Sequence, residues 1–390
     1  MKEGWDIRRL GDICTIERGG SPRPITAYIT DAPDGINWIK IGDAREGSKY
    51  ITSTAEKIKP EGMKKSRFVH KGDFILSNSM SFGRPYIMGV DGCIHDGWLV
   101  IRDENNTFNK SFLYYYLGSP TIYKEFSKLA VGGVVSNLNS NLVRGVKVVI
   151  PPIAEQEKIV AELDCLTGII EKKKQQLKEL DKLAQSIFYD MFGTSLKEKG
   201  FPVKMMGEIG TFQRGAGLQK KDFVNGGMPC IHYGQIHTAF GSYTTKHLTT
   251  IPKDLYAISK IGHPGDLLMV LTSEDVEGSC KSTAWLGEYD VAVGSDAAIF
   301  SNHSQNAIYL SYCTRTRSFF NEKSKYANGF KVTHIKTGDI GKIPIAIPPR
   351  ALQDLFAQKI EAIEKQKEQI MKSIQETETL FNSRMDYWFN

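Results

Sequence analysis

Arginine, asparagine and serine side chains gather in three stretches of the first 150 residues that are also rich in glycine and proline. Residues 19–25 read GGSPRPI, residues 77–86 read SNSMSFGRPY and residues 132–139 read GGVVSNLN. Arg23 and Arg84 each stand beside proline, which restricts the local backbone and can hold a guanidinium in a defined place. Such a guanidinium can form the paired hydrogen bonds with guanine that are the commonest specific protein–DNA contact. Solvation or phosphate contact is the more frequent role of a single arginine, so both roles stay open.

Three comparable stretches occur in the second half of the chain, at residues 214–223, 273–282 and 327–334. Their basic members are mainly lysines, which are point charges on flexible stems and therefore favour phosphate contact. We predict a DNA-binding surface on the loops of both halves. Its candidate residues are Arg18, Ser21, Arg23, Asn78, Ser81, Arg84 and Asn137 in the first half, and Arg214, Lys220, Lys221, Lys281 and Lys331 in the second.

Catalytic motifs are missing from the sequence. No phosphate-binding loop of the G-x-x-x-x-G-K-[ST] type occurs, and the glycines of residues 210–217 form no dinucleotide fingerprint. His95-Asp96 and Ser295-Asp296 have the residue types of an acid/base pair, but an isolated pair beside a strand is more often structural. We therefore expect no catalytic residues, no metal site and no cofactor in this chain.

The stretches lie on a scaffold that occurs twice. Residues 4–20 match residues 200–216 at an offset of 196, and residues 151–192 match residues 348–389 at an offset of 197. The offset changes only in the loop-like stretches between these matches. A repeated scaffold with different loops is typical of two copies of one module with separate ligands. Arg18 and Arg214 occupy the same repeat position, which favours one shared role, either a phosphate contact or an internal ion pair.

Each copy ends in a predicted long helix with an apolar seam at alternating spacings of four and three residues. Pro-Pro precedes each helix and predicts its start. Lys173 and Lys367 interrupt the two seams. We expect the helices to pair antiparallel as a coiled coil and to be available to protein partners. The residues predicted for this role are Ile159, Leu163, Ile170, Leu177 and Ile187 in the first helix, and Phe356, Ile360, Ile370, Ile374 and Phe381 in the second.

The globular parts combine short strand-like runs with one helix-like segment. In the first copy the runs are 13–17, 38–41, 73–77, 98–102 and 146–150, and the helix-like segment is 110–129. This mixture predicts an α+β fold. We expect two α+β target-recognition domains, at residues 1–150 and 194–347, separated by the long helices 151–193 and 348–390.

The charge of the chain is concentrated in the predicted domains. Of 390 residues, 50 are Lys or Arg and 44 are Asp or Glu, which gives a net charge of +6. Residues 1–150 hold 21 basic and 16 acidic residues, and residues 194–347 hold 17 and 13, whereas both helices are slightly acidic. This distribution is consistent with a polyanion bound by the domains and a protein bound by the helices.

Six scattered cysteines without a CxxC pair argue against a zinc site or a disulfide framework. No stretch of eighteen apolar residues occurs, so we expect no membrane segment and a cytoplasmic protein.

The chain resembles the specificity subunits of Type I restriction-modification enzymes along nearly all its length. The motifs that carry the resemblance in the first half are WDIRRLGDI (5–13), GDFIL (72–76), GVVSNLN (133–139) and IPPIAEQEKI (150–159). Those of the second half are NGFKVTHI (328–335) and IPPRALQDLF (347–356), where Gln353 matches Gln156 but Leu352 replaces Glu155.

This resemblance implies two target-recognition domains that each read one half of a bipartite asymmetric sequence in double-stranded DNA, held apart by the paired helices. It also implies two methyltransferase subunits and the restriction and translocation subunits as partners. S-adenosylmethionine, ATP and Mg would belong to those partners, with none of them bound by this chain.

Three other interpretations remain open on the sequence. A stand-alone coiled-coil DNA-binding regulator would bind a defined site without partners. A coiled-coil adaptor would show no salt-dependent DNA affinity. An enzyme acting on nucleic acid is least consistent with the missing motifs.

Overall fold

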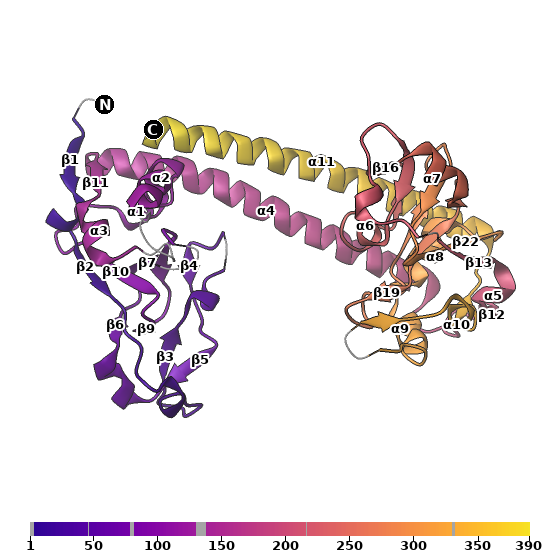
Figure 1. Cartoon of the computed structure of the whole chain (residues 1–390), viewed down its shortest axis with the longest axis horizontal. Helices are drawn as coiled ribbons and strands as arrows, with labels where there is room; N and C mark the ends of the chain where they lie inside the picture. The colour runs from indigo at the N-terminus through magenta and orange to yellow at the C-terminus, as the bar shows by residue number, and fades with distance from the viewer. Residues whose placement is uncertain (1–3, 46, 79–81, 130–137, 216, 330–331) are drawn as a thin grey trace. The chain divides into compact units, whose positions relative to one another are not determined.

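The computed structural model describes residues 4–45, 47–78, 82–129, 138–215, 217–329 and 332–390. The chain forms two compact units (Figure 1). Unit 1 contains residues 1–174 and 372–390, and unit 2 contains residues 175–371. The division falls inside both long helices, so each unit includes a segment of each helix.

Unit 1 is built on two sheets, and its first and last strands form a separate pair. β1 (Asp6–Arg9) pairs antiparallel with β11 (Lys147–Ile150). The five-stranded sheet has the order β2 (Thr15–Arg18), β10 (Trp98–Arg102), β7 (Phe74–Ser77), β8 (Pro85–Met88) and β4 (Tyr50–Ile51). The four-stranded sheet has the order β5 (Glu56–Ile58), β3 (Ile36–Ile39), β9 (Gly92–Ile94) and β6 (Arg67–Val69).

Unit 2 repeats this topology strand for strand. β12 (Val203–Met205) pairs with β24 (Pro344–Ala346). The five-stranded sheet has the order β13 (Thr211–Arg214), β22 (Ala297–Ser301), β18 (Leu267–Val270), β20 (Ser282–Trp285) and β15 (Tyr243–Thr244). The four-stranded sheet has the order β16 (Thr249–Ile251), β14 (Met228–Ile231), β21 (Val291–Val293) and β17 (Lys260–Gly262). Unit 2 also contains a short pair of β19 (Thr272–Ser273) with β23 (Thr333–His334). The predicted α+β fold and the repeat are thereby confirmed.

Short helices accompany the sheets. Unit 1 has α1 (Lys110–Leu117), α2 (Pro120–Leu129) and α3 (Ser140–Gly145). Unit 2 has α5 (Met206–Ile209), α6 (Tyr233–Thr238), α7 (Lys253–Ile258), α8 (Ala307–Cys313), α9 (Arg317–Lys323) and α10 (Thr337–Ile340). The single helix predicted over 110–129 is wrong, because Pro120 lacks the N–H that would continue α1 and instead begins a second helix.

The two long helices are α4 (Ile153–Phe192) and α11 (Arg350–Phe389), of 40 residues each. In unit 1 their segments run antiparallel, since Glu162 bonds Arg384 and Lys173 bonds Ser373. In unit 2 the segments are also antiparallel, since Asp181 lies 2.8 Å from Lys367 and Phe188, further along α4, packs against Phe356 nearer the start of α11. None of the helices among the described residues is long and apolar enough to cross a membrane.

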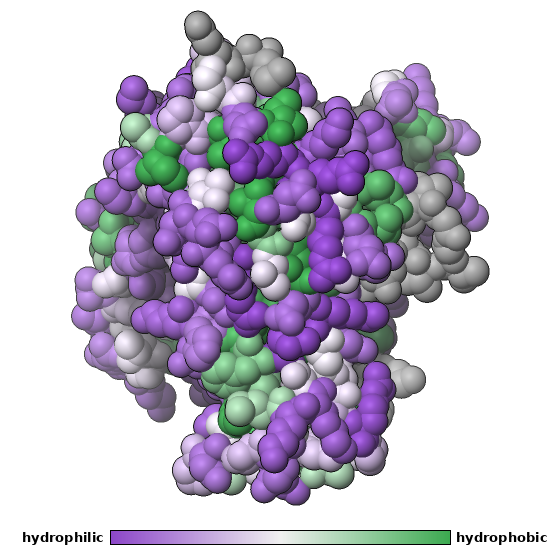
Figure 2. Space-filling model, turned by 90° about the vertical axis from the view of Figure 1, so that its left-hand side faces the viewer, coloured by the Kyte–Doolittle hydropathy of each residue, from purple (hydrophilic) through white to green (hydrophobic). Residues whose placement is uncertain are grey.

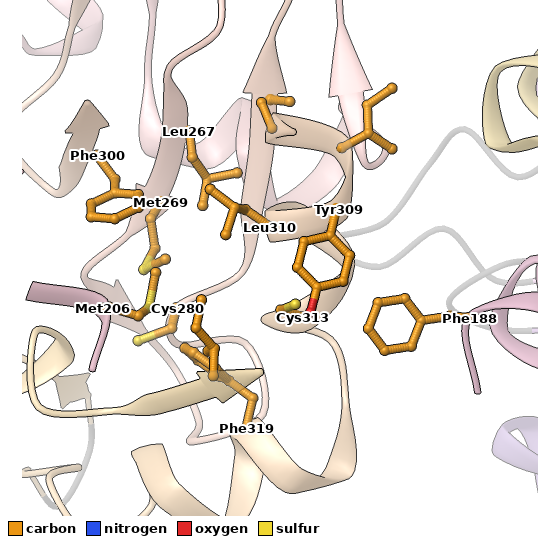
Figure 3. Packing of buried hydrophobic residues seen from close by; sticks show 14 of the residues in the cluster. Phe188, Met206, Leu267, Met269, Cys280, Phe300, Tyr309, Leu310, Cys313 and Phe319 are labelled. Atoms are coloured by element: carbon orange, nitrogen blue, oxygen red, sulfur yellow. The ribbon is translucent and has the colours of Figure 1, made fainter. Parts of the chain in front are cut away.

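The helix segments complete the hydrophobic core of each unit. The core of unit 1 includes Ile159 and Leu163 of α4 together with Met385 and Phe389 of α11. The core of unit 2 is drawn in Figure 3, where Phe188 of α4 faces Tyr309 of α8. Their rings are stacked at 5.9 Å between centroids. Each core therefore depends on both long helices.

The apolar seam departs from the predicted heptad in the last two turns of both helices. Phe188 and Phe192 of α4 are buried, as are Met385 and Phe389 of α11 at the matching repeat positions. The seam prediction had placed Ile187 and Met191, and Arg384 and Trp388, at these turns. A straight helix drifts relative to a strict 3.5-residue repeat, and at these turns the buried face packs on the core of the unit.

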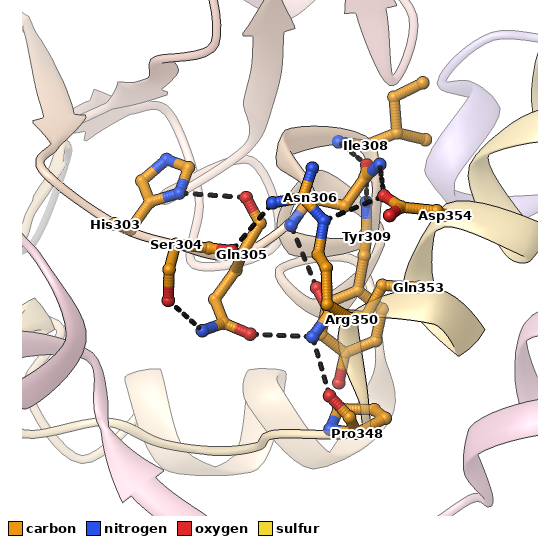
Figure 4. A network of polar contacts seen from close by, with 10 residues as sticks. All are labelled: His303, Ser304, Gln305, Asn306, Ile308, Tyr309, Pro348, Arg350, Gln353 and Asp354. Atoms are coloured by element: carbon orange, nitrogen blue, oxygen red, sulfur yellow. Dashed lines mark hydrogen bonds and ion pairs between the residues drawn. The ribbon is translucent and has the colours of Figure 1, made fainter.

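A fully buried glutamine near the start of each long helix joins it to its unit. The Gln353 amide oxygen accepts a hydrogen bond from the Asn306 N–H at 2.9 Å, and its nitrogen donates to Gln305 Oε1 and Pro348 O (Figure 4). Asn306 in turn caps α8 through the N–H groups of Ile308 and Tyr309. The glutamine thus fixes the start of α11 against the start of α8.

Candidate nucleic-acid interface

Four of the predicted DNA-contact residues of unit 1 contact Asp96, which lies just before β10. Its carboxylate accepts a hydrogen bond from Ser21 Oγ at 2.8 Å and lies 3.6 Å from the Arg23 guanidinium. Its backbone oxygen accepts hydrogen bonds from Arg18 Nε at 2.9 Å and Asn78 Nδ2 at 3.0 Å. Residues far apart in the sequence therefore meet in one loop cluster, with the Arg23 side chain 77% exposed at its surface.

The charge state of this cluster is set by its neighbours. Burial raises the pKa of Asp96, but the Ser21 hydrogen bond and the charges of His95, Arg18 and Arg23 together lower it below its usual value. His95 Nδ1 accepts a hydrogen bond from the Gly97 N–H, so Nε2 carries the proton and donates to Asp96 at 2.9 Å. Burial lowers the pKa of His95. The pair organises the loop, which agrees with the structural role expected for it.

The burial of Asn78 argues against the DNA contact predicted for its side chain. Its side chain is completely buried, and its backbone N–H and C=O bond Gly97 and Leu138. A residue without exposed surface cannot contact a base in this conformation, so its role is to support the Asp96 loop. Ser81 and Asn137 lie outside the described residues.

Arg18 and Arg214 share one structural role. Arg214 Nε donates to the backbone oxygen of Ser295 at 2.9 Å, as Arg18 does to Asp96 at the corresponding place before β22 and β10. Both arginines remain exposed. The sequence left open a phosphate contact or an internal ion pair for these arginines. In the structure each forms an internal hydrogen bond to a backbone oxygen, and its exposed guanidinium can also contact a phosphate.

Unit 2 builds its loop cluster around Asp296. The Arg214 guanidinium lies 3.7 Å from Asp296 Oδ1, and Thr272 Oγ1 donates to the same oxygen at 3.4 Å. Thr272 Oγ1 also lies 2.9 Å from His334 Nδ1, which belongs to the predicted loop 327–334. Three segments of the second repeat thus converge as three segments of the first do, but through different side chains.

The predicted lysines of unit 2 occupy different environments. Lys220 and Lys221 are exposed in a single turn of 3-10 helix, residues 220–222. Lys281 is half-buried, its Nζ donates to His237 O, and burial lowers its pKa. The Lys281 ammonium is therefore partly occupied by a hydrogen bond within unit 2. Lys331 lies outside the described residues.

A cleft of about 1040 Å³ opens in unit 2, and Lys281 is among the residues that line it. Its walls come from α4, α6, α9 and the loop 272–278. The loop contributes Glu274, Asp275 and Glu277 to the lining, which also includes Lys281 and Arg317. The predicted loop 273–282 therefore forms the rim of a cleft large enough for a nucleotide-sized group.

Unit 1 has a cleft of about 810 Å³ next to its helix segments, and Arg84 lines it. Lys49 Nζ lies 2.9 Å from Asp164 Oδ1 of α4, and the Tyr115 hydroxyl donates to the same oxygen at 2.5 Å. Lys49 also lies 5.0 Å from the centre of the Tyr115 ring. Lys49, Tyr115 and Asp164 line the same cleft as Arg84, so Arg84 shares it with a hydrogen-bonded cluster.

The seam residues predicted for partner binding are used inside the chain. Ile159, Leu163, Phe356 and Ile360 are completely buried, and Ile170 and Ile374 are each 8% exposed. These six side chains are covered by the other helix and the unit cores, whereas the other four predicted residues, Leu177, Ile187, Ile370 and Phe381, are half-buried. The large apolar residues that do remain exposed on the helices include Ile169, Leu183, Leu355, Met371, Leu380 and Tyr387.

Lys173 and Lys367, the charged interruptions, are satisfied within the helix pair. Lys173 Nζ donates to Ser373 Oγ at 2.5 Å and Thr377 Oγ1 at 3.3 Å. Burial alone would lower the pKa of Lys367, but bonds to Asp181 and Glu364 raise it. Both lysines tie one helix to the other.

The surface is mainly hydrophilic on the side shown in Figure 2, where hydrophobic residues form separate small groups. Among the described residues, no group of three His, Cys, Asp or Glu side chains could hold a metal ion.

Several residues of the loop clusters escaped sequence reasoning. Thr272 belongs to no sequence motif, and Asp96 and Asp296 stand out in the sequence only as members of the His95-Asp96 and Ser295-Asp296 pairs. The available signal was the repeat itself, because Arg18 and Arg214 occupy the same repeat position and each bonds the backbone oxygen of a residue just before β10 or β22.

Comparisons with known proteins relate the chain to one family. Residues 2–182 match the family model of the Type I restriction modification DNA specificity domain. The chain is 22% identical to the Type I restriction enzyme MjaVIII specificity subunit of Methanocaldococcus jannaschii over 407 residues, which cover 96% of this chain and 91% of that protein.

Two solved structures share the fold. One is a chain from a study of complex assembly and conformational transition of the type I R-M system, with a TM-score of 0.60, 19% identity and coverage of 100% of this chain and 98% of that one. The other is the Type-I restriction-modification system S subunit from M. genitalium, with a TM-score of 0.53, 14% identity and coverage of 98% and 95%.

Proposed function

We propose that the chain is a DNA specificity subunit of a Type I restriction-modification system, and that each repeat reads one half of a bipartite, asymmetric DNA target. The subunit is non-catalytic. Residues 1–150 and 194–347 are the two target-recognition domains of this proposal, and the long helices 151–193 and 348–390 connect them.

The observation that carries the proposal is the contrast between an identical scaffold and different loop clusters. Both units have the same strand order and the same arginine hydrogen bond at the end of β2 or β13. The cluster of unit 1 presents Arg23, whereas that of unit 2 presents His334 and the acidic rim of its cleft. Different side chains on one scaffold supply different hydrogen-bonding groups to the major groove, so they recognise different sequences.

The partners in this proposal are double-stranded DNA, two methyltransferase subunits and the restriction and translocation subunits. The exposed apolar residues of α4 and α11 would contact protein, since charged loops are better suited to the DNA backbone. S-adenosylmethionine, ATP and Mg would be bound by the partner subunits. Adenine methylation and DNA cleavage are then directed by this chain and carried out by the others.

A loop exchange tests the two-module proposal. Residues 19–139 are replaced by the corresponding segment of a related chain with a different target, and the methylated motif is mapped in cells that contain the partner methyltransferase. We expect a hybrid motif in which one half-site changes and the other is kept.

A motif in which both halves change, or neither does, would contradict the proposal. Tight binding of the isolated chain to a defined site, without any effect of the partners on specificity, would instead indicate a stand-alone regulator. Replacing residues 214–334 in the same way is the matched control, since it must alter the opposite half-site.

A further inference from the structure

Lys323, at the C-terminal end of α9, is a buried ammonium held by backbone carbonyls. It is 3% exposed. Its Nζ donates to the carbonyl oxygens of Glu277 at 2.8 Å and Ser279 at 2.5 Å. Within the described part of the chain it forms no ion pair with a carboxylate. Its Nζ also lies 5.5 Å from the centre of the Phe320 ring. A buried charge without a carboxylate partner is costly to desolvate, so its placement needs a reason beyond packing.

The carbonyls belong to the loop 274–281 between β19 and β20, which is held in a strained conformation. Cys280 is completely buried and has a φ of 57°, in the left-handed region that residues other than glycine rarely adopt. Strained residues of this kind persist only where the surrounding structure holds them, and they concentrate at functional sites. The Ser279 carbonyl that Lys323 binds is part of the peptide group that enters Cys280, so Lys323 fixes the backbone at the strained residue.

The loop itself is closed by local hydrogen bonds. The Gly278 N–H donates to Asp275 Oδ1 at 2.7 Å, and Ser279 Oγ donates to Val276 O at 2.7 Å. At its C-terminal end the loop is attached to β18, where the Cys280 N–H donates to Val270 O at 2.9 Å and the Lys281 carbonyl accepts from the Val270 N–H at 2.9 Å. Lys323 adds an attachment from α9 nearer the middle of the loop, at Glu277 and Ser279. Glu274, Asp275 and Glu277 of this loop line the cleft.

The first repeat supports its loop in another way. Phe126 of α2 occupies the repeat position of Lys323 at the offset of 197, and it is completely buried. A Cβ added at Gly83, in the loop between β7 and β8, would lie 3.0 Å from the Phe126 ring. The same helix position therefore supports the corresponding loop in both units, by ring packing in one and by an ammonium in the other.

We propose that Lys323 is a positioning residue that fixes the shape of the loop 274–281 and so sets the specificity with which unit 2 reads its half-site. The inference rests on the proposed function for its DNA readout. The role of Lys323 in holding the loop 274–281 concerns this chain alone and does not depend on DNA or partner subunits. Lysine can make two directed bonds to carbonyls, which an apolar side chain at this position cannot, so the loop conformation depends on the ammonium.

The test compares Lys323→Met with Lys323→Arg, which keeps donors at the same position, and with Lys323→Gln, which keeps a single amide donor group. Lys325→Met is the matched control, because Lys325 lies two residues further on, is exposed and pairs with Glu322. Amide hydrogen exchange is measured on the full-length chain. The methylated motif is measured with the partner subunits present.

For Lys323→Met we expect amide exchange at Cys280 and Lys281 to quicken by at least about tenfold, which corresponds to a loss of about 1.4 kcal/mol of local protection. Discrimination at one or more positions of the second half-site should fall by roughly tenfold, while the first half-site is unchanged. Lys323→Gln should lie between Lys323→Met and the parent, and Lys323→Arg and Lys325→Met should resemble the parent.

Unchanged exchange in Lys323→Met, or equal relaxation of both half-sites, would overturn the inference. If Lys323→Met does not fold, the same comparison is made with Lys323→Gln. A parent complex without a two-part motif would refute the proposed function, while the exchange measurement would still decide whether Lys323 anchors the loop.

Discussion

The amide oxygen of Gln156 accepts a 2.7 Å hydrogen bond from the backbone N–H of Asn109, the residue that caps α1. The pair recurs in the second repeat as Gln353 and Asn306 at 2.9 Å. Both glutamines are completely buried. Each links the start of a long helix to the start of a short helix in the same unit, so the direction of the long helix is fixed relative to the loops that the unit carries.

Gln353→Ala should lower the free energy of unfolding by about 1–3 kcal/mol, because the Asn306 N–H and the Pro348 carbonyl would lose their partner. Gln358→Ala is the control, since Gln358 is exposed on the same helix. Thermal or denaturant unfolding measures both. Equal stability of the two variants would contradict the role assigned to Gln353.

Ile170→Asp should destabilise the chain by several kcal/mol, because it places an unpaired carboxylate in the buried seam. The adjacent Ile169, which is 37% exposed, supplies the matched variant Ile169→Asp, for which we expect a much smaller loss. Urea unfolding of the two variants measures the difference. If Ile169→Asp proved the more harmful substitution, the seam would be misassigned by one residue.

Arg23→Ala and Lys220→Ala should affect DNA binding in different ways. Loss of a base contact by Arg23 would relax one position of one half-site by about 1–3 kcal/mol. Loss of a phosphate contact by Lys220 would weaken binding to all sequences and reduce the salt slope by about 1. Titrations of the assembled complex at several salt concentrations separate the two effects. An unchanged preference at every position in Arg23→Ala would remove Arg23 from the readout.

Stability should decline as the pH falls below about 6.5, partly through His303. Burial lowers the pKa of His303, whose ring is stacked on Phe300 at 5.2 Å. The unfolded chain therefore binds more protons than the folded chain between the folded pKa and the ordinary value. Stability is then lost as the pH falls through that window, by at most about 1.4 kcal/mol per pH unit for this group.

The variant His303→Asn keeps a donor for the Gln305 carbonyl and removes the titrating ring. We expect its unfolding free energy to depend less on pH than that of the parent between about pH 6.5 and 5. His95 and His232 also have pKa values lowered by burial, so part of the dependence should remain. An identical slope in parent and variant would show that His303 does not contribute.

Local patterns in the sequence were sufficient for the elements and their repetition. The Pro-Pro pairs and the alternating spacing predicted both long helices to within two residues of their bounds, since helix periodicity depends on near neighbours alone. The strands at 98–102 and 147–150 followed in the same way from short apolar runs. The α+β class and the antiparallel pairing of the helices were therefore predictable.

The tertiary structure alone decided how each loop residue is used. Asn78 and Arg23 were both candidates for DNA contact on the sequence. In the structure Asn78 is completely buried and bonds Asp96, whereas the Arg23 side chain is 77% exposed. No sequence motif singles out Lys323, and only the fold brings its Nζ within hydrogen-bonding distance of the Glu277 and Ser279 carbonyls. Burial and hydrogen bonding of this kind arise between segments 18 to 75 residues apart, as for Asn78 and Ser21 with Asp96, and no local periodicity encodes them. The sequence by itself therefore determined the repeated scaffold and its helices, and only the packing of distant segments determined which side chains support the loops and which remain free to meet DNA.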